Sequence, residues 1–340
     1  MSDYILNLRN LTKAISFYFS SIGVSIGLFL NLTTILIFQA KCFRKSNIRI
    51  FYTTLGLFDI AALLNSILFI QLLPNLGFNL SIGSDSSCKF VSLWRRCAIQ
   101  IPSWTHIIIT YDRFKSICFP KKYNTNNKKV FLKLGFIIIF IFLINLPHIF
   151  FYLNVKTDII QSNISNVTVN STRITSQACI AVTTIQTLTD IMNVCFRSFI
   201  PFVIMFILNV VMTKKFLKSK KKFYNGDSKM KKEFYFTKTV ITMNITFFIL
   251  YFPWSVWYIL NLSFSQQIGK SDLFKASMDL LQSISFSIAY LNNCSSFVVN
   301  FISNQIFRKV FIGFIGQRKI LTNSVNSLTN NAGKKSFQVN

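Results

Sequence analysis

The sequence contains few side chains that could act as general acids, general bases or metal ligands. Among its 340 residues there are two histidines, His106 and His148, and a single glutamate, Glu233. It has no glycine-rich phosphate loop, no paired-cysteine zinc spacing and no Gly-x-Ser-x-Gly turn for a nucleophile. These observations argue against an enzyme and predict neither a cofactor nor a bound metal ion.

One pair of opposite charges stands at the end of a long apolar run. Asp112 and Arg113 follow the mostly apolar residues 107–111, and Phe114 comes directly after them. If the run is a membrane helix, both charges can reach the polar interface, and Asp112 can hold Arg113 in place. The pair is then either two interfacial charges or part of a switch.

The composition is that of a membrane protein, because 51% of the residues are hydrophobic, only 14% are charged and the mean hydropathy is +0.46. A helix needs about 20 mostly apolar residues to cross a bilayer. The candidate spans are residues 15–39, 50–74, 88–111, 131–153, 191–213, 239–262 and 279–303. The sequence therefore predicts an all-α membrane protein, with a seven-transmembrane helix bundle over residues 15–303.

The two ends of the chain lie outside this bundle. Residues 1–14 are expected to form an extracellular tail, and residues 320–340 a disordered cytoplasmic tail. Residues 304–319 combine apolar side chains at helical spacing with Lys and Arg around them, which is typical of a helix at a membrane surface. A short amphipathic helix is predicted there, with the apolar face Phe307, Val310, Phe311, Phe314 and Ile315.

Charge gives the orientation in the membrane. Most of the 37 Lys and Arg residues fall in segments on the same side as the C-terminus. By the positive-inside rule this side is cytoplasmic, which predicts a multi-pass membrane protein with its N-terminus outside. The net charge of +27 then indicates attraction to anionic membrane lipids and acidic partners, and not to nucleic acid.

Glycosylation sequons agree with this orientation. Those in segments expected outside are Asn10, Asn79, Asn163, Asn166, Asn170 and Asn261. The sequence predicts a glycoprotein, with Asn10, Asn163, Asn166 and Asn170 as its acceptors.

The sequence has seven spans, Asp112 and Arg113 at the inner end of the third, and prolines in the fifth (Pro201) and the sixth (Pro253). In these features it resembles a rhodopsin-like G-protein-coupled receptor. The spacing from Cys88 to Arg113 matches the family pattern. The resemblance covers residues 15–318 and implies an extracellular ligand and a heterotrimeric G protein as partners. It also implies that both prolines bend their helices.

The family pattern implies a disulfide between Cys88 and Cys179. A separate observation favours the same pair, because these are the two of seven cysteines that fall in the expected extracellular, oxidising segments.

The resemblance also gives Arg113 a second partner. Glu233 precedes Pro253 by the spacing at which related receptors carry an acidic residue. We therefore expect Asp112, Arg113 and Glu233 to form a G-protein coupling switch, which ligand binding opens by moving the sixth helix.

A polar hub is expected inside the membrane, where a carboxylate is costly and by default functional. Asn31 and Asp59 match family positions in the first two helices, and Asn292 could join them from the seventh. In relatives this carboxylate helps to hold sodium. Pro102 and Ser296 replace two sodium partners, so the hub is either a sodium site or a structural hydrogen-bond network.

The ligand is expected to carry an acidic or carbonyl-rich group. Amine receptors have an aspartate where this chain has Arg95, and Arg197 lies one turn before Pro201. We expect Arg95 and Arg197 to bind such a group of a neuropeptide, with Tyr251 as a ring that senses it. The alternative is internal pairing of these arginines with Asp190 or Asp279.

Two other functions remain open. Residues 296–300, Ser-Phe-Val-Val-Asn, replace the family's Asn-Pro-x-x-Tyr motif in the seventh helix, and the fourth helix lacks the usual tryptophan. A seven-helix protein that no longer couples to G proteins is therefore one alternative. A transporter or channel is the other, but no row of ionisable residues across the membrane supports it.

Overall fold

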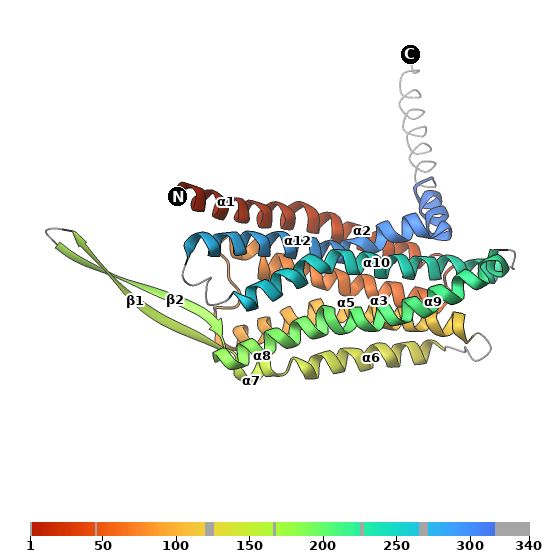
Figure 1. The fold of residues 1–340 in the computed structure, drawn as a ribbon, viewed down its shortest axis with the longest axis horizontal. Coiled ribbons are helices and arrows are strands. Elements are labelled where there is room, and N and C mark those ends of the chain that lie inside the picture. Colours follow the sequence, from red (N-terminus) through yellow and green to blue (C-terminus); the bar gives the residue numbers. More distant parts are fainter. Residues whose placement is uncertain are drawn as a thin grey trace, which may run out of the picture.

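The computed structural model describes residues 2–44, 46–119, 126–165, 168–224, 228–264 and 271–316. Within these ranges, seven long helical stretches run roughly alongside one another as an elongated bundle (Figure 1). In chain order they are α1 (Ser2–Tyr18) with η1 (Phe19–Gly23) and α2 (Val24–Phe38); α3 (Asn47–Asn65) with η2 (Ser66–Ile70) and the short α4 (Leu72–Asn75); α5 (Asp85–Cys118); α6 (Asn127–Ile144) with α7 (Pro147–Phe151); α8 (Thr183–Val194) with η3 (Cys195–Phe199) and α9 (Ile200–Tyr224); α10 (Ser228–Ser263); and α12 (Asp272–Ser303). The predicted seven-helix bundle is confirmed.

The bundle has the surface of a membrane protein. Five helices of the described part are long and apolar enough to cross a bilayer, and a sixth counts if α12 and the helix after it are taken as one span. Large apolar side chains point outward, as hydrocarbon requires. Phe29, Leu132, Phe136, Ile249 and Phe252 are each 64–75% exposed.

α5 is not among those apolar spans, because it carries arginines and other polar residues along its length. It packs against α3, α6, α9 and α10, so most of its polar side chains face protein and not lipid. This central position brings the charged end of α5 against its neighbours.

The first helix is longer than the sequence predicts. A tail is expected over residues 1–14, but α1 begins at Ser2 and continues through η1 into α2. Polar contacts attach α1 to α12: Arg9 Nη2 lies 3.4 Å from Asp272 Oδ1, and the Ser283 hydroxyl lies 2.8 Å from that of Ser16. The stretch lacks glycine and proline, so nothing interrupts the helix before the membrane span.

A further helix, Gln305–Gly316, follows α12 after a bend of 97°. Phe307 is fully buried, and the Phe311 ring lies 5.2 Å from that of Phe297 and 5.7 Å from that of Phe301. These contacts hold the helix against the end of α12. The expected tail, residues 320–340, lies outside the described residues.

Between α7 and α8 the chain forms a β-hairpin, whereas the polar composition of this segment suggests a loop. Strands β1 (Leu153–Ser165) and β2 (Thr168–Ile180) pair antiparallel, from Leu153 opposite Ile180 to Ser165 opposite Thr168. The segment is rich in Thr, Val and Ile, which favour strands. The hairpin projects beyond the end of the bundle, at the same end as the N-terminus (Figure 1).

Apolar clusters fill the bundle, and two of them are rich in aromatic residues. One lies toward the end opposite the hairpin and includes Phe38, Tyr52, Phe236 and Phe307. The other packs Tyr251, Trp254 and Trp257 of α10 with Met278 and Ala289 of α12. Buried polar residues such as Arg113 and Arg197 lie among these clusters, so apolar packing restricts their positions.

Candidate switch and ligand sites

Arg113 is held by two carboxylates near the end of α5. Its Nη2 lies 2.6 Å from Asp112 Oδ2, and its Nη1 lies 2.7 Å from Glu233 Oε2 of α10. The Ser116 hydroxyl donates to the same glutamate oxygen at 2.9 Å. The Arg113 and Asp112 side chains are 4% and 1% exposed, and that of Glu233 is 28% exposed. The structure thus brings the three proposed switch residues together and joins α5 to α10.

Another polar contact links the same helices deeper in the bundle. Asn244 of α10 donates from Nδ2 to Thr110 Oγ1 of α5 at 2.9 Å and to Asn209 Oδ1 of α9 at 3.0 Å. All three residues are buried. Sequence reasoning missed this cluster, although asparagines inside apolar spans are a signal for such contacts. We call Thr110, Asn209 and Asn244 the asparagine cluster.

The intramembrane hub differs from the expected one in its third member. Asp59 is fully buried, and it accepts hydrogen bonds from Asn293 Nδ2 at 3.0 Å and Ser296 Oγ at 3.1 Å. Asn31 Nδ2 donates to the Asn293 backbone carbonyl at 2.7 Å. Asn292 Nδ2 has no partner among the described residues. The choice of Asn292 is therefore corrected to Asn293, because the latter's side chain is the one that faces Asp59.

Arg197 is buried in an aromatic cage. Arg197 is 1% exposed, and its guanidinium carbon lies 4.5 Å from the Trp254 ring centroid and 5.3 Å from that of Tyr251. The rings of Phe286 and Tyr290 lie 5.7 and 5.8 Å away. None of its three side-chain nitrogens has a hydrogen-bond partner among the described residues. Two of the predicted ligand residues, Arg197 and Tyr251, are thus in contact.

Arg95 lies elsewhere, on a cavity of about 360 Å³ at the hairpin end of the bundle. This cavity is lined by Asn79, Ser81, Ile82, Ser92, Arg95, Arg96, His148, Tyr152, Ala178, Cys179, Gln186 and Asp190. Arg95 is exposed, and it forms no ion pair with another described residue. Asp190 pairs with Arg96 instead. Among the described residues, the alternative of internal pairing is therefore not observed for Arg95 or for Arg197.

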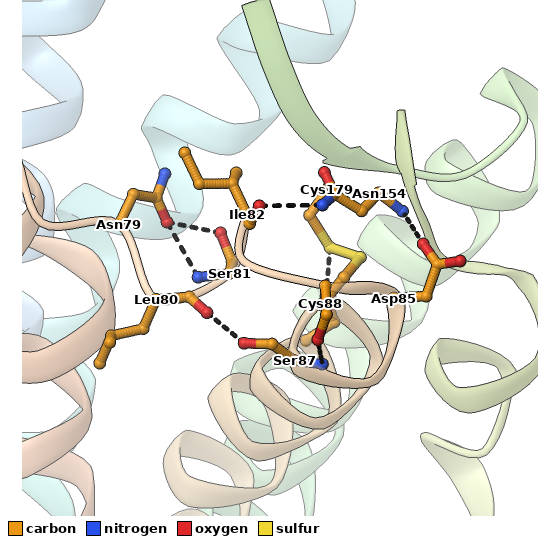
Figure 2. Close-up of a disulfide and its surroundings, with 11 residues drawn as sticks. Asn79, Leu80, Ser81, Ile82, Asp85, Ser87, Cys88, Asn154 and Cys179 are labelled. Carbon is orange, nitrogen blue, oxygen red and sulfur yellow. Dashed lines mark hydrogen bonds between the residues drawn. A yellow bond between two sulfur atoms is a disulfide. The ribbon is translucent and has the colours of Figure 1, made fainter. Parts of the chain in front are cut away.

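The Cys88–Cys179 disulfide ties the hairpin to the beginning of α5, with a sequence separation of 91 residues between the two cysteines (Figure 2). Hydrogen bonds reinforce the link: Asp85 Oδ1 accepts from the Asn154 backbone N–H at 2.8 Å, and Asn154 Nδ2 donates to the Ile82 carbonyl at 2.9 Å. The expected disulfide is present. It anchors the hairpin base beside the cavity.

The predicted prolines occupy different helix contexts. Pro253 lies inside α10, which continues on both sides of it. Pro201 is the second residue of α9, whose first residue directly follows the π-helical segment η3. A proline lacks a backbone N–H and leaves a carbonyl free in the preceding turn, and a wider π-turn is one adjustment to this.

The predicted glycosylation sites fall on the hairpin and on α1. Asn10 is exposed on α1, and Asn163 of β1 lies opposite Asn170 of β2. Asn166 lies outside the described residues.

Together these features define a multi-pass membrane protein with a seven-helix receptor architecture. A model of the family described as 7 transmembrane receptor (rhodopsin family) matches residues 30–295, which is most of the chain, and the protein belongs to this family. No curated protein matches the sequence. The resemblance to rhodopsin-like receptors is confirmed, and the family acts through extracellular ligands and G proteins.

Proposed function

We propose that this receptor binds an extracellular peptide and activates a heterotrimeric G protein by opening the Arg113–Glu233 ion pair. The observation that carries the proposal is the 2.7 Å contact between Arg113 Nη1 and Glu233 Oε2, which joins α5 to α10. In the resting receptor this contact restrains α10. When it opens, Arg113 becomes available to the G protein.

The size of this restraint suits a switch. Hydrogen bonds to charged groups contribute about 1.5–3 kcal/mol each, and about 1.4 kcal/mol changes an equilibrium tenfold. A ligand that favours the open state by a few kcal/mol is then enough to invert the population. Asp112 keeps Arg113 paired during the opening, so the buried guanidinium does not lose both carboxylates at once.

The cavity around Arg95 supports a peptide as the ligand. It is open at the hairpin end of the bundle, and Arg95 is exposed there without an ion-pair partner among the described residues. A guanidinium in that state binds a carboxylate or a carbonyl group well. We infer that this end faces the outside of the plasma membrane and that the hairpin asparagines are glycosylated. The opposite end of the bundle, with its basic segments, then faces anionic lipid and the G protein.

A peptide screen tests this function. The chain is expressed in cells with a promiscuous G protein, and calcium release is recorded for a panel of neuropeptides. We expect at least one peptide to give a saturable response, which Arg113→Ala abolishes at equal surface expression. Surface expression without any peptide response, combined with substrate-dependent current or uptake, would instead favour a transporter or channel.

A further inference from the structure

Arg197 carries a charge that the surrounding protein does not neutralise. Arginine stays protonated in proteins, and a buried charge normally has a carboxylate partner or a full set of hydrogen bonds. Arg197 is 1% exposed and has neither among the described residues. Of the two carboxylates expected as internal partners, Asp190 pairs with Arg96 and Asp279 is exposed.

The aromatic rings stabilise the charge only in part. Rings attract a cation through their faces, but they accept no ordinary hydrogen bond from the N–H groups at the guanidinium edge. The Trp254 ring, the nearest at 4.5 Å, therefore leaves those donors unsatisfied. An occupant that accepts hydrogen bonds would complete the site.

Two further unpaired donors belong to the same cluster. The indole N–H groups of Trp254 and Trp257 have no partner among the described residues, and these side chains are 2% and 8% exposed. Both rings pack against Phe286, with centroids 6.2 and 6.1 Å away, and Arg197 lies 5.7 Å from the same ring. The cluster thus combines a fixed positive charge with several unpaired N–H donors.

We propose that Arg197, Trp254 and Trp257 form a buried binding site for one small monovalent anionic group, either a halide or a single carboxylate. The group must be small, because Arg197 is 1% exposed and lies apart from the cavity that contains Arg95. It comes either from solution as a free ion or from the ligand as a carboxylate. In the second case the site deepens, and rests on, the proposed function.

Thermal unfolding of the purified full chain in detergent, without G protein, tests the site. One arm titrates sodium chloride, with sodium sulfate at matched ionic strength as its control. The other titrates 3-phenylpropionate, with neutral 3-phenylpropionamide as its control. We expect at least one anion to raise the midpoint of unfolding in a saturable way, since a ligand that binds only the folded state stabilises it.

The variants compare two arginines of the same receptor. Arg197→Gln is expected to weaken anion binding about tenfold or more, because it removes the charge. Arg9→Gln, which changes an exposed arginine of α1 that pairs with Asp272, should leave it unchanged. Trp254→Phe keeps an aromatic ring but removes one N–H, and should weaken binding severalfold. If Arg197→Gln does not fold, the Trp254→Phe comparison decides.

Each result has a distinct meaning. Stabilisation by chloride alone identifies a free-ion site, and stabilisation by phenylpropionate alone identifies a subsite for a ligand carboxylate. No saturable effect of either anion, or an equal effect in wild type and in the folded Arg197 or Trp254 variant, would overturn the proposal. Anion binding without any G-protein response in cells would contradict the proposed function and leave this site intact.

Discussion

Arg113 and Glu233 are 120 residues apart in the sequence, yet Nη1 of one lies 2.7 Å from Oε2 of the other. Ser116 donates to the same carboxylate, so two residues on successive turns of α5 hold one residue of α10. The asparagine cluster links these helices again, deeper in the bundle. The ion pair and the asparagine cluster therefore join α5 to α10 at two levels, and the two can be tested separately.

The asparagine cluster is expected to restrain α10 more weakly than the ion pair. Side-chain hydrogen bonds inside membrane proteins contribute about 0.6 kcal/mol on average. Asn244→Ala should therefore raise basal G-protein activation about two- to fourfold, measured as ligand-independent nucleotide exchange. Thr242→Ala is the matched control, because its hydroxyl donates to the Lys238 carbonyl within α10 itself. Equal basal activity in both variants would contradict a restraining role for Asn244.

The hub provides a comparison between adjacent asparagines. Asn293→Ala removes a donor to the fully buried Asp59, and an underpaired buried carboxylate costs about 1–3 kcal/mol or more. Asn292→Ala removes an amide group whose Nδ2 has no partner among the described residues. We expect Asn293→Ala to lower the unfolding midpoint by several degrees more than Asn292→Ala. The reverse order would show that the hub is assigned to the wrong residue.

Cys88→Ser is expected to destabilise the receptor by about 2–5 kcal/mol, as loss of a native disulfide commonly does. The readouts are surface expression and unfolding midpoint. Cys195→Ser, which alters a cysteine outside the disulfide, is the control. Comparable surface expression and stability of the two variants would mean that the hairpin does not depend on the Cys88–Cys179 bond.

Arg95 is expected to set ligand potency. Once an activating peptide is found, Arg95→Gln should shift its dose response about 10- to 100-fold, the effect of losing one or two charge-assisted hydrogen bonds. Surface expression should be unchanged, because the exposed Arg95 has no ion-pair partner among the described residues. An unaltered dose response would remove Arg95 from the ligand site.

Hydropathy predicts the helices because the apolar requirement of a bilayer applies to whole segments. Hydropathy does not predict which way an individual side chain faces, because adjacent residues on a helix point about 100° apart. For this reason hydropathy offers no basis for choosing Asn293 over Asn292 as the partner of Asp59. For the same reason hydropathy does not distinguish Arg96 from Arg95 as the partner of Asp190.

The family spacing predicts that Arg113 and Glu233 meet, and the ion pair is present. The family pattern gives no corresponding spacing for the asparagine cluster, whose three members lie on α5, α9 and α10. The hairpin is hard to predict for another reason: its polar residues suggest a loop, whereas its Thr, Val and Ile content favours strand pairing once the disulfide fixes its base.

The most direct test of the switch is the basal activity of Glu233→Ala. This change removes the acceptor of both Arg113 Nη1 and the Ser116 hydroxyl. Ligand-independent nucleotide exchange on the G protein is measured at matched surface expression, with Ser116→Ala as a partial version of the same change. We predict about a tenfold rise for Glu233→Ala, corresponding to roughly 1.4 kcal/mol, and a smaller rise for Ser116→Ala. Basal exchange equal to wild type in folded Glu233→Ala would contradict the proposed switch.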